Sequence, residues 1–453
     1  MVLRRVLVIA ATLAVVVPTI SPASSAAHRP APRVLGVGLM ASTDASGLGG
    51  WLPSSGVPWT YAYRYLGGGA GTSKNWTAMA PEASYPIVYA SLAARHGYTP
   101  VFTYYQMLAG HDCRTCGEAQ RDLANLNDPV VMRGYFNDFA LLMKRLGTGT
   151  YDGVNGYGHD AVVHVEPDLS GYAELAVLSP GSNCFGHCTR QGNDPSNLRA
   201  AVQSTGLPST LRYPNTFRGF NEALLRLRDT YAPNVRLAVH VSNWATGYDL
   251  NSSSDNRLQP AALGRLAGSF AAQSGAGYTD GSHSTYDLVF NDVSNKDAGY
   301  YQKVLHKNRF WDQANNVFPN FHRWEAYLKA VRSQTHRWTF VWQVPIGNQL
   351  LQSENNTAGH YQDNRVQYFF DHMTELRDSG IAALLFGTTI SAASNFADVA
   401  HDGTTNPRKV CSQDGWSTGR TVCSSRHASR SDDDGGYLRE RAANYYRQPL
   451  ALG

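Results

Sequence analysis

Residues 161–172 read Ala-Val-Val-His-Val-Glu-Pro-Asp-Leu-Ser-Gly-Tyr. This apolar run has the length of a strand and ends in polar residues, which predicts a buried β-strand over 161–166. Similar runs occur at residues 34–40, 61–66, 99–106, 235–242, 286–292, 338–344 and 381–387. Amphipathic helical patterns separate many of them, at residues 130–146, 221–231, 260–273, 321–335 and 362–379.

Alternating strands and helices predict a parallel sheet. Eight strands over this length favour a closed (β/α)₈ barrel of the TIM type, regular or distorted, over an open doubly wound sheet, because no glycine fingerprint opens a first βα turn. We therefore expect a single α/β barrel domain over residues 34–453, with long loops at the carboxyl face. A helix is expected to close the chain near residues 437–446.

The first 26 residues have the features of a secretory signal peptide. Arg4 and Arg5 precede an apolar run from Val6 to Val17, and small residues end at Ala26, the expected cleavage site. A membrane anchor is the alternative, but the apolar run is too short for a hydrocarbon core of about 30 Å. We expect a secreted, extracellular protein with a flexible segment at 27–33 and no membrane span.

The six cysteines are an even number in an exported chain, so disulfides are expected. Cys411 and Cys423 are expected to close a loop near the C-terminus. The other four are Cys113, Cys116, Cys184 and Cys188. Their short spacings fit two local bridges, two cross-links or a zinc site, of which bridges are favoured.

The composition indicates a folded chain with a large core, at 43% hydrophobic and 16% charged residues. A net charge of +4 does not imply nucleic acid or an anionic membrane as a partner. Aromatic residues make up 11% and often lie beside polar residues, as on surfaces that stack on sugar rings.

No ester-hydrolase elbow, metalloprotease helix or phosphate loop occurs. We expect a monomer that binds polysaccharide or oligosaccharide, without cofactor or metal.

Glu166 and Asp168 are the first candidates for catalysis. Alternation places Val163 and Val165 toward the helices, and His164, Glu166 and Asp168 toward the barrel interior and its mouth. Two carboxyls this close at a strand end should raise at least one pKa, as a glycosidase's general acid requires. The structural alternative is a carboxylate that caps the following turn.

The string Val165–Leu169 resembles the Ile-Glu-Pro-Asp-Ser-Leu strand end of glycoside hydrolase family 6, the inverting cellulases and cellobiohydrolases. Upstream, residues 100–105, His111-Asp112-Cys113 and Gly117-Glu118 resemble that family's apolar strand, its Arg-Asp-Cys and its Gly-Glu. The resemblance implies that Asp168 is the general acid, that Asp112 tunes its pKa, and that Cys113 pairs with Cys184.

The resemblance is limited to residues 99–190. The family's later Leu-Asp-Ala-Gly-His and Gly-Trp signatures are absent, and the corresponding strand reads Val-His-Val-Ser-Asn-Trp at 239–244. The family's barrel is distorted and usually counted with seven strands, whereas eight are predicted here. The glucose subsites of the family are therefore not transferred to this chain.

Retaining glycosidases on (β/α)₈ barrels offer a second precedent, with glutamates at the ends of strands four and seven. Glu166 fits the first position, but the seventh strand ends in Gln343. Asp292, after strand six, is the available second carboxylate, unless it only bonds the next turn.

Further side chains near strand ends are candidates for sugar contacts through stacking and hydrogen bonds. They are Tyr104, Trp244, Trp342, Gln343, Asn348 and His164. His164 and His240 are expected to bond carboxylates or substrate rather than form a metal pair. The sequence favours a secreted, inverting, polysaccharide-acting glycoside hydrolase. A catalytically inactive glycan-binding barrel at the cell envelope and a zinc-dependent hydrolase or deacetylase are the alternatives.

Overall fold

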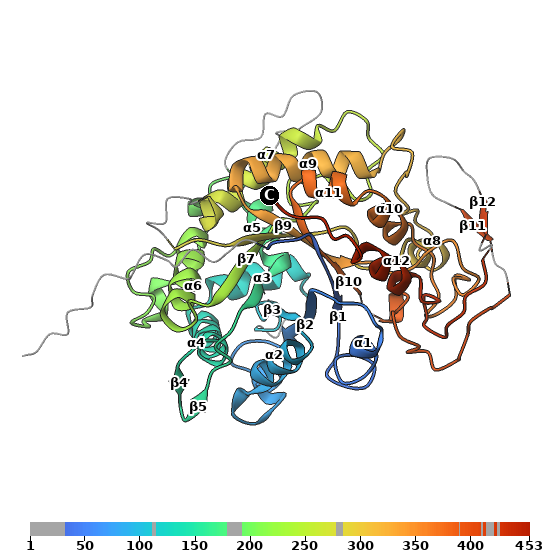
Figure 1. Ribbon diagram of the computed structural model, residues 1–453. Helices are drawn as coiled ribbons and strands as arrows, with labels where there is room; N and C mark the ends of the chain where they lie inside the picture. The colour runs from blue at the N-terminus through green and yellow to red at the C-terminus, as the bar shows by residue number, and fades with distance from the viewer. Residues whose placement is uncertain are drawn as a thin grey trace, which may run out of the picture.

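A computed structural model describes residues 32–110, 115–178, 193–277, 284–388, 390–408, 411–413, 421–423 and 426–453. At its centre is a closed barrel of eight parallel strands (Figure 1). The strands are β1 (Gly36–Met40), β2 (Tyr61–Gly67), β3 (Thr99–Tyr105), β6 (Ala161–Val165), β7 (Val235–His240), β8 (Leu288–Asp292), β9 (Trp338–Val344) and β10 (Ile381–Phe386). They are adjacent in chain order, and β10 pairs with β1 to close the ring. The (β/α)₈ prediction is confirmed.

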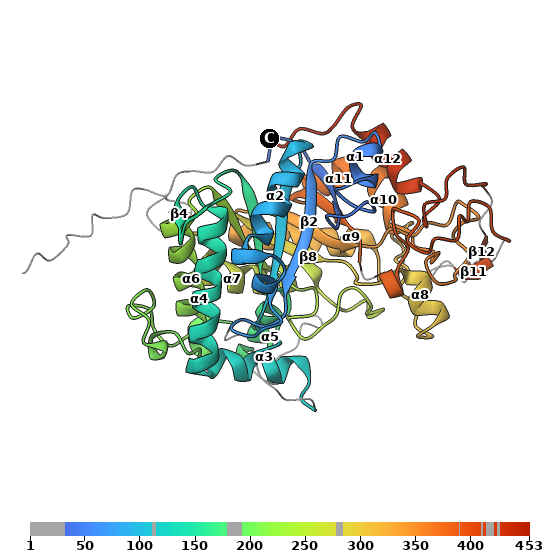
Figure 2. The same cartoon turned by 90° about the horizontal axis from the view of Figure 1, so that it is seen from below.

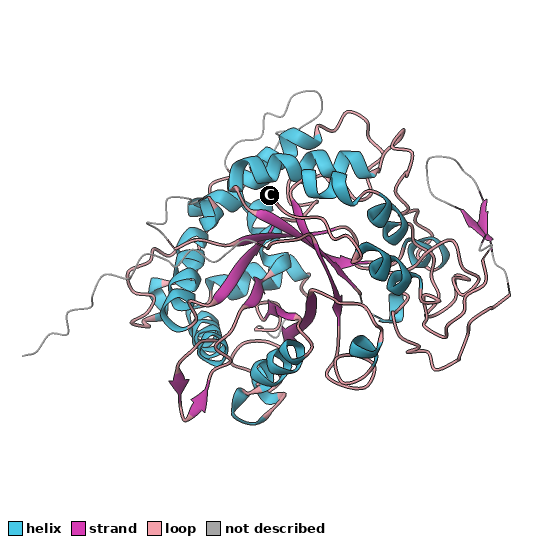
Figure 3. Cartoon of the chain, in the orientation of Figure 1, coloured by secondary structure: helices cyan, strands magenta, loops and turns pink. Residues whose placement is uncertain are grey.

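Helices form an outer layer around the strands (Figure 3). They are α1 (Trp51–Ser54), α2 (Tyr85–Arg95), α3 (Glu118–Asn127), α4 (Pro129–Leu146), α5 (Pro167–Val177), α6 (Phe217–Tyr231), α7 (Pro260–Ala271), α8 (Ala298–Lys303), α9 (Phe321–Thr335), α10 (Arg365–Asp371), α11 (Met373–Asp378) and α12 (Tyr437–Tyr445). The helix expected over 362–379 is thus two helices, because the backbone leaves the helical region at His372. Side-chain caps begin several helices, as where Asp128 accepts backbone N–H groups of α4.

Shorter elements lie in the connections. Two-stranded antiparallel sheets are formed by β4 (Thr150–Tyr151) with β5 (Val154–Asn155), and by β11 (Cys411–Gln413) with β12 (Thr421–Cys423). The short helical turns are η1 (Trp76–Ala78), η2 (Pro81–Ala83), η3 (Pro195–Asn197), η4 (Gln203–Thr205), η5 (Ala272–Ala276, a π-helix) and η6 (Ile390–Ala392). Cys411 lies opposite Cys423 in this pairing, and Cys116 is disulfide-bonded. Which cysteines pair with one another, Cys411 and Cys423 included, stays a prediction.

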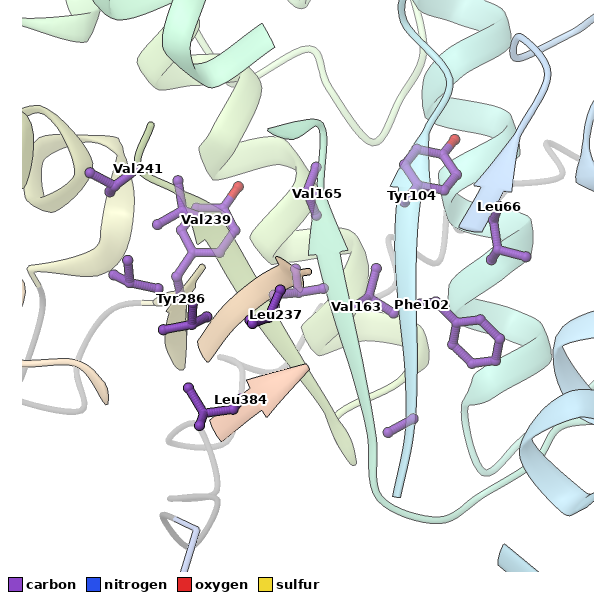
Figure 4. Packing of buried hydrophobic residues seen from close by; sticks show 14 of the residues in the cluster. Leu66, Phe102, Tyr104, Val163, Val165, Leu237, Val239, Val241, Tyr286 and Leu384 are labelled. Atoms are coloured by element: carbon purple, nitrogen blue, oxygen red, sulfur yellow. The ribbon is translucent and has the colours of Figure 1, made fainter. Parts of the chain in front are cut away.

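The barrel strands separate two apolar clusters. Val163 and Val165 belong to the outer cluster between strands and helices (Figure 4), whereas Val162 and Phe290 belong to the cluster inside the barrel. His164 points inward and stacks on Phe290 at a ring distance of 4.2 Å. The predicted alternation therefore holds as far as Val165.

The C-terminal tail lies at the amino end of the barrel. Leu35, just before β1, donates its backbone N–H to Leu450 at 2.9 Å, and Val34 bridges to Ala451. In Figure 2 the C-terminus lies at the opposite end of the molecule from α3 and α5. The carboxyl ends of the strands are therefore not covered by this tail. In the described part of the chain, no helix combines the length and apolar character needed to cross a membrane.

Candidate active site

A pocket of about 430 Å³ opens at the carboxyl ends of the strands, the end at which barrel enzymes place their active sites. Residues from six of the eight strands, or directly after them, line it together with residues of the following loops. The lining comprises Tyr65, Tyr105, Glu118, Pro167, Asp168, His240, Trp244, Asp249, Asn251, Asp292, Val293, Ser294, Asn295, Tyr301, Arg309, Trp342, Gln343 and Arg365.

Asp168 lies in the first turn of α5, directly after β6, and lines the pocket. Burial, with the neighbouring Glu118 and Asp292 and against a lowering by His240, raises the pKa of this carboxyl to about 7. A carboxylic acid with this pKa holds its proton near neutral pH. Asp168 therefore has the property that a general acid needs.

Glu118, the first residue of α3, is the carboxyl group that raises the pKa of Asp168 most strongly. It hydrogen-bonds Asp168, and the Tyr105 hydroxyl donates to its Oε1. In the sequence, Glu118 stood out only as part of the Gly-Glu that resembles family 6. The structure gives it the influence on the pKa of Asp168 that the resemblance assigned to Asp112, which lies outside the described residues.

Asp292 ends β8 and supplies a further carboxyl group to the pocket. Its Oδ1 lies 3.3 Å from His240 Nε2, and His240 Nδ1 lies 3.0 Å from His164 Nε2. His164 Nδ1 in turn lies 3.4 Å from the Thr103 hydroxyl. Burial, followed by His240, lowers the pKa of His164 well below its ordinary value, so this imidazole is neutral.

A neutral His164 has one N–H, so it donates a hydrogen bond to one of its two neighbours and accepts one from the other. If Thr103 donates to Nδ1, then His164 donates to His240, and His240 donates to the carboxylate of Asp292. In the reverse direction His240 donates to His164, and His164 donates to the Thr103 hydroxyl. His164 thus acts on the pocket through His240, and the expectation that these histidines bond a carboxylate fits the geometry.

Glu166 does not line the pocket, contrary to the expectation that it would point there with Asp168. β6 ends at Val165, and Glu166 has a left-handed backbone with φ of 41°, so the strand alternation stops one residue earlier. Its side chain is 1% exposed and accepts the backbone N–H groups of Gln106 and Met107 at 2.9 and 3.2 Å. Glu166 is thus a structural carboxylate, but it binds the backbone after β3 and does not cap the turn that follows it, because its side chain makes no cap hydrogen bond to α5.

Tyr104 and Asn348 are also absent from the pocket lining. Tyr104 is fully buried in the outer cluster, where its hydroxyl donates to Asp138 at 2.6 Å. Asn348 is fully buried, donates to the backbone of Asp434 and accepts the N–H of Leu350. Both sit beside strand ends as expected, but they support the surrounding structure instead of facing the pocket.

Trp244, Trp342 and Gln343 line the pocket, as expected from their places after β7 and in β9. The Trp342 ring lies 5.6 Å from the ring of Tyr65, and the Gln343 amide donates to the Tyr65 hydroxyl. Flat rings beside hydrogen-bonding groups suit a sugar ring. His164, the remaining candidate, is buried beneath this surface.

Several pocket residues were not predicted, because they come from long loops without a motif. Arg309 pairs with Asp249 at 3.1 Å, and Arg365 pairs with Asp363 at 2.9 Å, so both cations of the pocket wall have a carboxylate partner. Retaining glycosidases on (β/α)₈ barrels have a glutamate at the end of the seventh strand. At that position this chain has the neutral amide of Gln343.

Within the described residues, one group of three side chains has the arrangement of metal ligands, and it lies outside this pocket. Within the described part of the chain, no third metal ligand therefore lies close enough to His164 and His240 to complete a metal site with them. The zinc-dependent hydrolase thus has no support from the described pocket.

No family model matches the chain, and no curated protein matches it. Among solved structures, it is similar to an exo-β-1,4-mannosidase from Opitutaceae bacterium strain TAV5, at 11% identity and a TM-score of 0.42, covering 94% of this chain and 62% of that one. A Bacteroidetes-affiliated GH5 cellulase has 11% identity and a TM-score of 0.42, with 92% of each chain covered. A thermostable mutant of a xylanase from Cellvibrio japonicus has 11% identity and a TM-score of 0.40, covering 90% and 98%.

Proposed function

We propose that the protein is a glycoside hydrolase that acts on a polysaccharide. The observation that carries this proposal is the meeting of Asp168, Glu118 and Asp292 in one open pocket at the carboxyl ends of the barrel strands. Glycoside hydrolysis requires two carboxyl groups of different protonation at the scissile bond. The aromatic rings in the same lining, such as Trp244 and Trp342, supply flat surfaces for sugar rings.

Asp168 is the general acid in this proposal. Its proton, retained near neutral pH through burial and the neighbouring Glu118, passes to the glycosidic oxygen as the bond to the leaving sugar breaks. Glu118 is a positioning residue, because it acts on the reaction through the pKa of Asp168.

Asp292 is the second carboxylate. The hydrogen bond from His240 orients it. As a general base it would take a proton from a water that attacks the anomeric carbon, which gives inversion of configuration, as in the family that residues 165–169 resemble. As a nucleophile it would form a glycosyl-enzyme and give retention.

Two substitutions in the pocket test the activity. We expect release of reducing ends from at least one of a panel of plant, fungal and bacterial cell-wall glycans, and loss of about a thousandfold or more in kcat for Asp168→Asn and Asp292→Asn. Asp378→Asn, at a mostly exposed carboxyl outside the pocket, is the control and should retain wild-type activity. Binding of a glycan without any hydrolysis across the panel would instead identify a non-catalytic glycan-binding barrel.

The anomer formed first distinguishes the two roles of Asp292. NMR of the product immediately after addition of enzyme would show the anomer opposite to that of the substrate for inversion. The same anomer as in the substrate would overturn the general-base role.

Secretion is part of the proposal, supported by the charged, apolar and small-residue segments of residues 1–26. Expression of the full chain in a host with the same export route should give a protein in the medium whose N-terminus is Ala27. Retention of all the protein inside cells with the first 26 residues intact would contradict it.

A further inference from the structure

A second group of side chains converges on the outside of the barrel, between α9 and α11, which lie side by side in Figure 1. His322 and Glu325 lie three residues apart in α9, and Glu375 lies in the first turn of α11. One ligand atom from each lies within 4.8 Å of the others, and His322 Nε2 is 3.5 Å from Glu375 Oε2. None of the three lines the pocket of the proposed active site.

Glu325 is the observation that sets this group apart from an ordinary charged surface. Its side chain is 4% exposed, and its Oε1 has no hydrogen-bond partner within the described residues. Oε2 accepts one hydrogen bond, from the Ser379 hydroxyl at 3.3 Å. Burying a carboxylate oxygen without a partner is costly. A cation held by this group would supply the missing partner.

The surrounding contacts hold the group in place. Residues three apart on a helix share one face, so His322 and Glu325 project together from α9. Phe321 stacks on Tyr368 with ring centroids 3.6 Å apart, and Tyr368 stacks on His372 at 4.0 Å, which fixes α9 against α10 and the start of α11. His372 Nδ1 also lies 3.1 Å from Glu375 Oε1. An outer hydrogen bond of this kind orients a carboxylate ligand.

We propose that His322, Glu325 and Glu375 bind one Zn²⁺ ion that joins α9 to α11. One imidazole nitrogen and two carboxylates suit zinc, whereas calcium and magnesium prefer oxygen ligands alone. The two carboxylates balance the charge of the ion. The His322 and Glu375 side chains are 59% and 47% exposed, so solvent can supply a water as the fourth ligand and both side chains can adjust to the ion.

Titration of the tag-free, EDTA-treated mature chain with ZnCl₂ in a calorimeter tests the proposal. We expect one equivalent of zinc to bind with micromolar or tighter affinity, and zinc to raise the Tm. His322→Ala and Glu375→Gln, both at exposed side chains that the fold tolerates, should each weaken binding by about tenfold or more and remove the rise in Tm. His96→Ala, at an exposed histidine after α2, is the matched control and should bind zinc as the wild type does.

An absence of zinc binding up to millimolar concentration would overturn the proposal. So would equal zinc affinity in the wild type, His322→Ala and Glu375→Gln, because the ion would then be held elsewhere, for example by cysteines. Tighter binding of CaCl₂ than of ZnCl₂ would contradict the assigned metal. These readouts do not involve glycan hydrolysis, so they stand apart from the proposed activity.

Discussion

Glu118 is the residue that most directly sets the protonation of the proposed acid. The proton must be on Asp168 for catalysis, so activity should fall as pH rises through its pKa of about 7. Glu118→Gln removes a negative charge beside Asp168 and should lower that pKa toward the ordinary value. The alkaline limb of kcat/KM against pH should then move to lower pH by about one unit or more.

The pH profile of Glu440→Gln, at an exposed carboxyl on α12, is the control for this shift and should match the wild type. An alkaline limb that stays in place in Glu118→Gln would show that Glu118 does not act on the acid. A fall in activity at every pH without any shift would point to substrate binding by Glu118.

Glu166 should respond to substitution quite differently from Asp168. Glu166→Gln keeps an oxygen for the backbone N–H groups of Gln106 and Met107, so it should hydrolyse glycan at the wild-type order of magnitude. Glu166→Ala leaves those groups unsatisfied and should lower the free energy of unfolding by about 2 kcal/mol or more. Urea unfolding beside reducing-end assays separates the two effects, and loss of activity in a well-folded Glu166→Gln would restore this residue to the catalytic machinery.

The same residue gives a pH dependence of stability. Burial raises the pKa of Glu166 to about 8, from an ordinary value of 4.5. Between these two values the unfolded chain ionises while the folded chain keeps the proton, so this group makes the fold less stable as pH rises from about 4.5 to 8. Glu166→Gln should therefore gain stability relative to the wild type between pH 5 and pH 8.

Among the elements, α5 carries the proposed acid and packs closely on the segment after β7. A Cβ built at Gly171 would lie 2.6 Å from the Trp244 ring and 2.8 Å from the Ser242 hydroxyl. Gly171→Ala must therefore move α5 or Trp244, both of which line the pocket. We expect a loss of about 1–3 kcal/mol in stability and a lower kcat/KM, measured by thermal unfolding and glycan hydrolysis.

Gly134→Ala is the matched control for Gly171→Ala. Gly134 lies within α4, and its added Cβ would meet only ordinary contacts at 3.7 Å or more. Alanine favours a helix over glycine by about 1 kcal/mol, so this variant should be as stable as the wild type or more stable. Equal effects of the two substitutions would rule out close packing of α5 as the cause.

The strands could be predicted from sequence because both their faces are buried, so each appears as an apolar run that stops at a polar residue. The same pattern could not place Glu166, because a single left-handed residue ends the alternation and its neighbours give no signal of it. The sequence pattern also predicted one helix where the structure has two, α10 and α11, which are separated at His372. Asp249 and Arg309 reach the pocket from separate loops, and only the closed barrel brings them together.

At the scale of the whole molecule, the two ends of the barrel have different roles. The residues proposed for catalysis lie at one end, and contacts that stabilise the fold lie at the other. The pocket opens at the carboxyl ends of the strands, while the chain's last residues pair with the segment before β1 at the amino end. Leu452 also packs against the cluster inside the barrel. Changes at this end should therefore affect folding and leave substrate binding intact.

Deletion of residues 450–453 tests that separation. It removes the hydrogen bond from Leu35 to Leu450, the bond from Leu452 to Arg33, and the apolar contact of Leu452. We expect the free energy of unfolding to fall by about 2–3 kcal/mol, with a lower Tm and an unchanged KM. Deletion of Gly453 alone, at which an added Cβ would meet nothing within 4 Å, is the control and should change neither. A raised KM at full folding in the longer deletion would mean that the two ends of the barrel are coupled, since no residue of the tail lines the pocket.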